Sequence, residues 1–244
     1  MRYMGSKNRL AEELAPIIQS YITDETKGYL EPFVGGANMI DKIKCENRIG
    51  YDSHKQLIAL FKKLQTNKDE IPDEIPFAEY ERVKNNKNDY EDWYLGLVGF
   101  LGSFGAKYFD GYARNHKNDS TGQIQRGSIK SLKKQYESLK NVKFECKDFR
   151  EIDDDICNYV IYCDPPYKNT KKYSTKNFPY DEFYDWCKEM SKNNIVLISE
   201  YSMPDDFECI WEQEVKVNFD SNRKKQKDLK NKRIEKLFIF KGDE

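Results

Sequence analysis

The chain has 244 residues, which is enough for one large domain or for a core domain that carries an insertion. Charged residues make up 34% of the sequence but the formal net charge is only -1, so any nucleic-acid-binding surface must be local. No apolar stretch approaches the roughly 20 residues of a membrane span. The two histidines and six dispersed cysteines lack metal-ligand spacing. Together these features predict a cytoplasmic protein with reduced cysteines, no metal and no membrane anchor.

The first elements in chain order alternate between helix and strand patterns. Ser6 can cap a helix over the following residues, with a kink or break expected at Pro16. A strand over residues 29–34 then leads into Gly35 and Gly36, which let a ligand approach the backbone closely, and a helix is expected after them.

A second short strand over residues 48–52 ends in an acid, Asp52. This acid lies about twenty residues after the first strand, where nucleotide-binding α/β folds keep a ligand for ribose hydroxyls. Asp52 could equally cap the helix that follows it. The expected buried face of that helix consists of Leu57, Ile58, Phe61 and Leu64.

Residues 62–140 differ from the rest, because lysine and asparagine become common and the strand–helix alternation stops. We expect an inserted, mainly helical domain. Near the end of this domain we expect a helix that is capped by Ser128. Residues 104–118 mix aromatic, basic and amide side chains, which stack on bases, contact phosphates and read base edges. The alternative is an insertion that only packs against the core. We favour recognition, and expect nucleic-acid contacts from Lys107, Tyr112, Arg114, Asn115, Asn118 and Arg126.

The strand–helix alternation returns after residue 140. A strand over residues 142–146 precedes Asp148-Phe149, and a helix carries Phe183, Trp186, Cys187 and Met190 on one face. Further strands are expected over residues 158–163, 195–199, 207–211, 215–219 and 234–240. The segment 221–233 is crowded with lysine and arginine, and is either a solvated hairpin loop or a phosphate clamp that uses Arg223 and Lys224.

The strand over residues 158–163 runs into Asp164-Pro165-Pro166-Tyr167. It must stop there, since proline has no N–H to donate, so Asp164 lies at the carboxyl end of a strand, where open α/β sheets bind ligands. The lone pair of an amino group on an aromatic base is delocalised into the ring, which makes the nitrogen a poor nucleophile. Asp164 can accept one N–H and the Pro165 carbonyl the other, which localises that lone pair, while Tyr167 stacks on the base. The alternative is a strand end that merely contains two prolines.

Together these segments resemble the Dam-like, or D12 class, DNA adenine-N6 methyltransferases over nearly the whole chain. The order of these segments also fits that family, because the cofactor loop comes first, the recognition insertion second and the catalytic motif third. The segments that carry the resemblance are Tyr3-Met4-Gly5-Ser6-Lys7, Glu31-Pro32-Phe33-Val34-Gly35-Gly36, Asp52, Asp148-Phe149, the motif from Asp164 to Tyr167, and Arg233-Ile234-Glu235.

The resemblance implies an α/β fold, namely a Rossmann-like S-adenosylmethionine-dependent methyltransferase fold. Residues 1–61 and 141–244 would form the catalytic, cofactor-binding domain, and residues 62–140 the inserted helical recognition domain. Lys7 and the backbone near Gly35 would hold the carboxylate of S-adenosylmethionine, and Asp52 its ribose. The other implied cofactor contacts are Tyr3, Pro32, Phe33, Gly36, Asp148, Phe149 and Asp164.

The implied reaction is methyl transfer from S-adenosylmethionine to adenine N6 in double-stranded DNA after the base flips out of the helix. The enzyme is expected to act as a monomer without a metal. The catalytic motif would polarise any planar amino group, so cytosine N4, an RNA base or a protein amide stay open as acceptors, as does a non-catalytic DNA-binding relative. The lysine- and asparagine-rich composition suggests a phage or prophage source, and hence the host cytoplasm.

Overall fold

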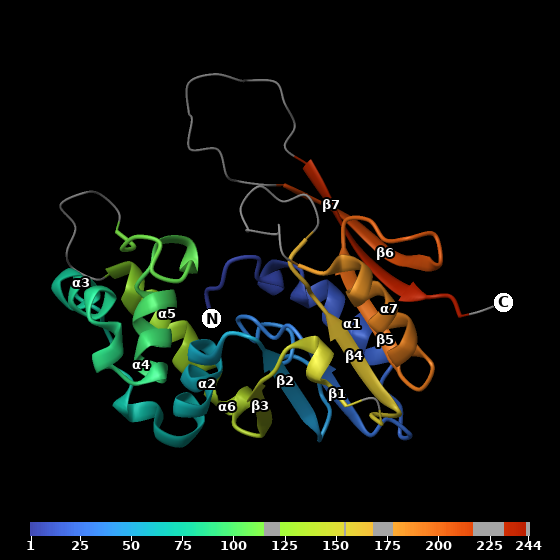
Figure 1. Ribbon diagram of the computed structural model, residues 1–244, viewed down its shortest axis with the longest axis horizontal. Coiled ribbons are helices and arrows are strands. Elements are labelled where there is room, and N and C mark those ends of the chain that lie inside the picture. Colours follow the sequence, from blue (N-terminus) through green and yellow to red (C-terminus); the bar gives the residue numbers. More distant parts are fainter. Residues whose placement is uncertain (115–122, 154, 168–177, 217–231, 243–244) are drawn as a thin grey trace.

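A seven-stranded sheet with the order β3-β2-β1-β4-β5-β7-β6 forms the centre of the protein (Figure 1). The computed structural model describes residues 1–114, 123–153, 155–167, 178–216 and 232–242. The strands are β1 (Gly28–Glu31), β2 (Arg48–Asp52), β3 (Val142–Cys146), β4 (Tyr159–Cys163), β5 (Ile195–Glu200), β6 (Phe207–Lys216) and β7 (Lys232–Phe240).

The order of the sheet reverses at β1. Strands β2 and β3 lie on one side of β1 and β4 lies on the other, and all five strands from β1 to β5 are parallel. β7 pairs antiparallel with both β5 and β6. A reversal of this kind leaves a crevice at the carboxyl ends of the two strands that flank it, here β1 and β4. This topology confirms the predicted Rossmann-like α/β fold.

Both faces of the sheet are buried, because its strands carry apolar side chains at successive positions. In β4, Val160 and Tyr162 face one core, while Ile161 and Cys163 face the other. Helices α1 (Ala11–Ser20) and α2 (Lys55–Asn67) contribute to the first core. Helix α7 (Tyr180–Ser191) contributes Phe183, Cys187 and Met190 to the second.

The segment between α2 and β3 is helical, as predicted. Figure 1 shows its helices gathered beside α2, at the β3 end of the sheet. They are α3 (Phe77–Asn85), α4 (Asp92–Gly96), α5 (Gln123–Lys134) and α6 (Tyr136–Leu139). The predicted domain boundary after residue 61 falls inside α2, whose Phe61 and Leu64 are both fully buried in the same core. We therefore propose that the insertion begins after α2.

Two predictions near the amino terminus are wrong. Residues 32–44 form turns where a helix was expected after the glycines, since Gly35 and Ala37 have positive φ angles of 47° and 51° that a helix cannot contain. Helix α1 continues through Pro16 without a break. The burial of Leu14 and Ile18 on either side of the proline stabilises the helix despite the missing N–H.

Two predictions further along the chain are also corrected. Helix α5 begins at Gln123, so Ser128 lies inside it, and its hydroxyl donates to the Ile124 carbonyl at 3.2 Å. The strand expected at residues 207–211 continues to Lys216 as one strand, β6, whose register shifts between Cys209 and Trp211, and residues 217–219 of the second expected strand lie outside the described residues. The polar residues Glu212, Gln213 and Glu214 interrupt the apolar sequence pattern, but they pair with β7 without a break.

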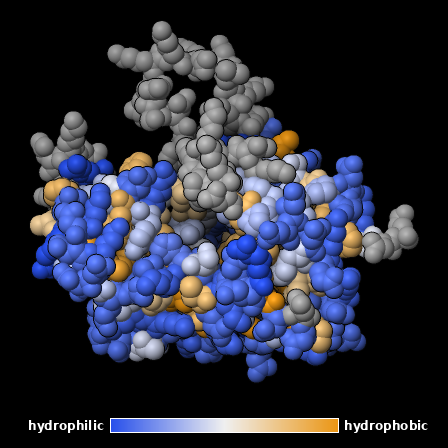
Figure 2. Space-filling view, viewed as in Figure 1, coloured by the Kyte–Doolittle hydropathy of each residue, from blue (hydrophilic) through white to orange (hydrophobic). Residues whose placement is uncertain are grey.

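The surface seen in Figure 2 is mostly hydrophilic, with apolar side chains scattered over it. None of the described helices is long and apolar enough to cross a bilayer. Within the same residues, no group of three His, Cys, Asp or Glu side chains could hold a metal ion. All six cysteines are free thiols.

Candidate active site

The carboxyl ends of β1 and β4 bring two predicted motifs together. The strands are paired in parallel, with Leu30 opposite Ile161, so the glycine turn after β1 and the Asp164 motif after β4 leave the sheet at the same edge. The side chain of Asp164 is 20% exposed and lies at the rim of the core. This is the place in the fold where the sequence predicted a ligand site.

A lysine from the amino terminus contacts the carboxylate of Asp164. The Nζ atom of Lys7 lies 3.1 Å from Asp164 Oδ1 and 3.2 Å from Oε2 of Glu235, which comes from β7. The Lys7 side chain is only 9% exposed. Three charged side chains that are far apart in the sequence therefore form one nearly buried cluster.

The charges in this cluster depend on one another. Burial would lower the pKa of Lys7, but Asp164 and Glu235 outweigh it and raise the pKa above its ordinary value. Burial raises the pKa of Asp164, the positive charge of Lys7 opposes that rise, and the negative charge of Glu235 adds to it. Lys7 therefore stays protonated and favours the ionised form of Asp164.

Tyr167 lies beside this cluster and is almost fully buried. Its hydroxyl donates to Glu235 Oε2 at 3.0 Å, and the Lys7 ammonium lies 4.1 Å from the centre of its ring. The ring of Tyr201 packs edge-on against it at 4.5 Å. The ring is thus held in one orientation next to Asp164, as base stacking requires.

The two prolines of the motif hold the backbone between Asp164 and Tyr167. Pro165 is buried, and the Pro166 carbonyl accepts a hydrogen bond from the Tyr180 hydroxyl at 2.8 Å. Tyr180 begins α7, so this bond ties the motif to the helix that covers the second face of the sheet. A stiff motif with a fixed helix behind it can present an acid and a ring at a constant separation.

Asp52 and the glycine turn form the second half of the site. The backbone N–H of Gly35 donates to Asp52 Oδ2 at 3.1 Å, and the N–H of His54 donates to Oδ1 at 2.9 Å. Burial raises the pKa of Asp52 to about 6, although both hydrogen bonds oppose the rise. Asp52 thus ties the glycine turn to the backbone just before α2, whose N-cap is His54, and its contact with a ribose stays a prediction.

The glycine turn is packed closely against Tyr3. A Cβ atom on Gly36 would lie 2.7 Å from the Cβ of Tyr3, so no larger residue fits without a shift. Beside this turn, a cavity of about 400 Å³ is lined by Tyr3, Met4, Phe100, Ala106, Lys107, Tyr108 and Asp110. The N-terminal motif and the insertion therefore line one aromatic cavity together.

These residues fit a nucleoside-containing cofactor. The Nδ1 atom of His54 is buried and has no hydrogen-bond partner among the described residues, and its ring packs against Phe100 and Tyr108. An unpaired buried nitrogen is costly unless a ligand pairs with it. Together with the acid Asp52 two residues earlier, it offers the polar contacts that a ribose and a base need.

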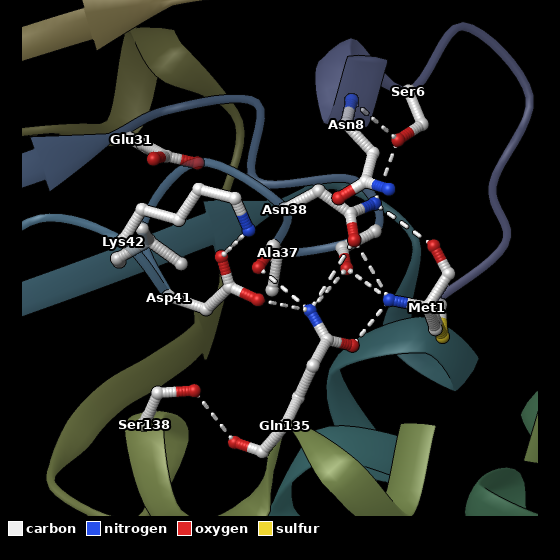
Figure 3. A network of polar contacts seen from close by, with 12 residues as sticks. Met1, Ser6, Asn8, Glu31, Ala37, Asn38, Asp41, Lys42, Gln135 and Ser138 are labelled. Atoms are coloured by element: carbon white, nitrogen blue, oxygen red, sulfur yellow. Dashed lines mark hydrogen bonds and ion pairs between the residues drawn. The ribbon is translucent and has the colours of Figure 1, made fainter. Parts of the chain in front are cut away.

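A network of polar contacts fixes the glycine turn to the insertion (Figure 3). The side-chain amide of Gln135, at the junction of α5 and α6, donates to the Ala37 carbonyl at 3.0 Å and to Asp41 Oδ2 at 2.8 Å. Asn38 Nδ2 donates to the Ser6 hydroxyl at 2.7 Å and to the Met1 carbonyl at 2.9 Å. The turn, the N-terminal motif and the insertion are therefore held as one unit.

The other two residues that the resemblance assigns to the cofactor lie near η6 (Phe149–Glu151). Asp148 caps this short helix and pairs with Arg150 at 2.7 Å. Phe149 is 1% exposed and packs against Phe33, with ring centres 5.8 Å apart. In this structure Phe149 packs against the turn that contains Phe33. Pro32, which precedes Phe33, is buried.

The residues predicted to contact nucleic acid occupy different environments. Tyr112 is 7% exposed and its hydroxyl donates to the Ile75 carbonyl at 2.8 Å, so it belongs to the core of the insertion and we withdraw it from the interface. Lys107 pairs with Asp110 at 3.0 Å on the rim of the aromatic cavity. Arg114 and Arg126 are exposed. Asn115, Asn118, Arg223 and Lys224 lie outside the described residues.

Two acids at the site, the buried Glu31 and the partly buried Glu235, were not selected as site residues from the sequence. Glu31 ends β1, is 2% exposed, and accepts a hydrogen bond from the Tyr29 hydroxyl at 2.8 Å. Burial raises the pKa of Glu31 well above its usual range. Glu235 lies in the charged first half of β7, and its side chain is 14% exposed. For Glu31 the available signal was an acid next to apolar residues at the end of a strand, and for Glu235 it was the Arg233-Ile234-Glu235 motif of the resemblance.

Comparison with known proteins supports the same assignment. Type II methyltransferase M.MjaIII of Methanocaldococcus jannaschii is 24% identical over 217 residues, which are 76% of this chain and 74% of that protein. The crystal structure of SMU.472 in complex with SAH aligns with 100% of this chain but only 55% of its own, at 13% identity and a TM-score of 0.40, a likeness too weak to add to the argument. The family model of the D12 class N6 adenine-specific DNA methyltransferases matches residues 3–97 and 94–220. Because these matches span most of the sequence, the chain belongs to the D12 class of DNA methyltransferases, which transfer a methyl group from S-adenosylmethionine to adenine N6.

Proposed function

We propose that this methyltransferase acts on double-stranded DNA, and that the target adenine flips out of the helix into the space between Asp164 and Tyr167. The observation that carries the proposal is the pairing of a partly exposed acidic side chain with a fixed aromatic ring, beside the glycine turn at the sheet switch point. The amino group of a base inside a duplex cannot reach a residue at this depth, so extrusion is needed. The family assignment favours adenine N6 over cytosine N4, RNA and protein acceptors.

The chemistry of the pocket follows from its hydrogen-bond acceptors. Asp164 accepts one N–H of the target amino group and the Pro165 carbonyl accepts the other, which localises the nitrogen lone pair toward the donor. S-adenosylmethionine supplies a methyl group activated by the positive charge on sulfur. The main task of the protein is then to hold the nitrogen and the donor in line.

We assign the cofactor to the edge formed by the glycine turn and Asp52. The Asp52 carboxylate and the unpaired Nδ1 of His54 provide polar partners, and Tyr3 closes the aromatic cavity next to Gly35. Lys7 pairs with Asp164 in the free protein, and the resemblance assigns it to the cofactor carboxylate. Both roles are open to it, because an ammonium group has three donors.

Base flipping can be measured with 2-aminopurine at the target position, once the methylated sequence has been mapped on genomic DNA. We expect fluorescence to rise on binding, because a flipped base loses its stacking neighbours, and we expect Tyr167→Ala to reduce the rise. A duplex with 2-aminopurine two positions away is the control. No rise at the target position with bound, active enzyme would contradict extrusion.

We further propose that the insertion reads the DNA sequence. Arg126 contacts Glu74 Oε2 through Nε at 2.9 Å and Nη2 at 2.6 Å, and both side chains are about half exposed. The Arg114 guanidinium lies 5.4 Å from the ring centre of Phe77. Exposed arginines held by such contacts are preorganised to contact guanine edges.

Arg114→Ala or Arg126→Ala should relax the preference at one base pair, by about 1–3 kcal/mol for a bidentate contact. The measurement is the methylation rate on a set of singly substituted duplexes. Arg82→Ala is the matched control, since Arg82 is an exposed arginine of the same insertion that pairs with Glu79. If the Arg114 and Arg126 variants lose activity equally on every sequence, the insertion is not the reader.

We also propose that the enzyme acts as a monomer in the cytoplasm, or in the host cytoplasm if a phage encodes it. The chain itself carries the donor site, the base pocket and the proposed reader, so one copy suffices for recognition and chemistry. Its DNA substrate and its six free thiols fit that compartment.

A further inference from the structure

Glu235 has contacts that no role considered so far explains. It lies in β7, and its side chain is 14% exposed. A single oxygen, Oε2, lies 3.2 Å from Lys7 Nζ and accepts a hydrogen bond from Tyr167 at 3.0 Å. Glu235 therefore holds both side chains that lie next to Asp164.

Lys7 occupies the place that a flipped base needs. Its ammonium donates toward Asp164 Oδ1 and at the same time lies 4.1 Å from the ring centre of Tyr167. A base stacked on that ring, with its amino group on Asp164, would need the same acceptor and the same ring face. Lys7 must therefore shift when the base enters.

The second carboxylate gives Lys7 a place to remain. If Lys7 left the cluster, two largely buried carboxylates would face each other without a cation, which is costly. If Lys7 keeps its contact with Glu235, only the bond to Asp164 has to be exchanged. Asp164 then trades one N–H donor for another, and the ammonium stays paired.

We propose that Glu235 is a positioning residue, which retains Lys7 and orients Tyr167 while Asp164 exchanges the lysine for the target amino group. This inference rests on the proposed function, because it assumes that the base binds at Asp164. It predicts that the transfer step depends on the negative charge of Glu235 more than on the size of its side chain.

The central test is Glu235→Gln, which keeps the size of the side chain and one acceptor oxygen but removes the charge. Lys7 would then have Asp164 as its only anionic partner and would compete more strongly with the base. We expect kcat to fall by about 10- to 100-fold, as for a displaced positioning group, with little change in the Kd for the cofactor measured by calorimetry.

A pH profile separates this role from a merely structural one. The groups that face Asp164 are Lys7, Glu235, Tyr167, Tyr162 and Glu31. The charge of Glu235 raises the pKa of Asp164, so its removal should lower that pKa and move the acidic limb of the rate profile to lower pH. A loss of packing alone would reduce the rate without moving this limb.

The matched control is Glu212→Gln, which removes an exposed carboxylate from the neighbouring strand β6, where Glu212 lies 3.6 Å from Lys236. It should leave kcat and the pH profile unchanged. In a Lys7→Met background, Glu235→Gln should have little further effect on kcat, because the side chain that it retains is gone. If Glu235→Gln fails to fold, Tyr167→Phe serves as a second test. It removes only the hydroxyl group that donates a hydrogen bond to Glu235, and it should still lower kcat and the 2-aminopurine signal.

The outcomes distinguish this inference from the proposed function. A parent enzyme that methylates DNA, together with a Glu235→Gln enzyme of equal kcat and unshifted acidic limb, would overturn the role of Glu235 alone. Full additivity with Lys7→Met would overturn it as well. A folded parent enzyme that transfers no methyl group to DNA would instead overturn the proposed function.

Discussion

Asp164→Ala should lower the rate of methyl transfer by about 10²–10³-fold, the size expected when one preorganised partner of the reacting group is removed. Asp164 follows β4 with its side chain 20% exposed, and in the proposed mechanism it is the acceptor that localises the lone pair of the target nitrogen. That interaction matters most in the transition state, so turnover should fall while most of the DNA affinity is kept. Single-turnover methylation and a filter-binding titration measure the two quantities separately.

Two comparisons sharpen this test. Asp164→Asn keeps one oxygen acceptor and should retain more activity than Asp164→Ala. Both variants keep the pairing of Lys7 with Glu235, so the lysine remains anchored. A rate for Asp164→Ala within a few-fold of the parent would mean that this strand end is not the active site.

Asp52→Ala should weaken cofactor binding by about 1.5–3 kcal/mol, the cost of losing a charged hydrogen-bond partner, which is roughly a 10- to 150-fold rise in Kd. Calorimetric titration with S-adenosylmethionine measures it. The titration is best made at pH 8, since the pKa of Asp52 is raised to about 6 in the free protein and the carboxylate must be ionised to accept both ribose hydroxyls. DNA affinity should change much less.

Asp52 also binds the backbone at Gly35 and His54, so the variant needs a control for local structure. Asp52→Asn keeps the shape of the side chain and should lie between the parent and Asp52→Ala. Asp185→Ala, an exposed acid on α7, should leave the Kd unchanged. An unchanged Kd in Asp52→Ala would reduce Asp52 to a support for the turn before α2.

Much of the central sheet could be predicted from short-range pattern. The strand at residues 142–146 is β3 with the same bounds, and the expected strand before Asp164 is β4 within one residue. Both are buried strands with clear ends, where prolines or polar residues stop the pattern. Asp52 at the end of β2 and Asp164 just after β4 could then be placed at the carboxyl edge of the sheet.

What the sequence could not provide was long-range contact. Lys7, Asp164 and Glu235 are separated by most of the chain, and only the path of β7 beside β5 brings the last of them to the site. Turn geometry was also missed, since the positive φ angle of Ala37 follows from the packing of the glycine turn. Tyr112 shows the opposite error, because an aromatic residue in a polar loop was taken for a reader and packs in the core.

The most direct test of the central claim, that this site methylates adenine N6 in duplex DNA, is a digest of the methylated product. Parent and Asp164→Ala enzymes are incubated with S-adenosylmethionine carrying a labelled methyl group, separately with unmethylated duplex DNA and with RNA, and the nucleosides are separated. We expect the parent to place the label in N6-methyladenine from duplex DNA alone, and Asp164→Ala to place almost none. Label in N4-methylcytosine or in RNA, or equal label with both enzymes, would contradict the account.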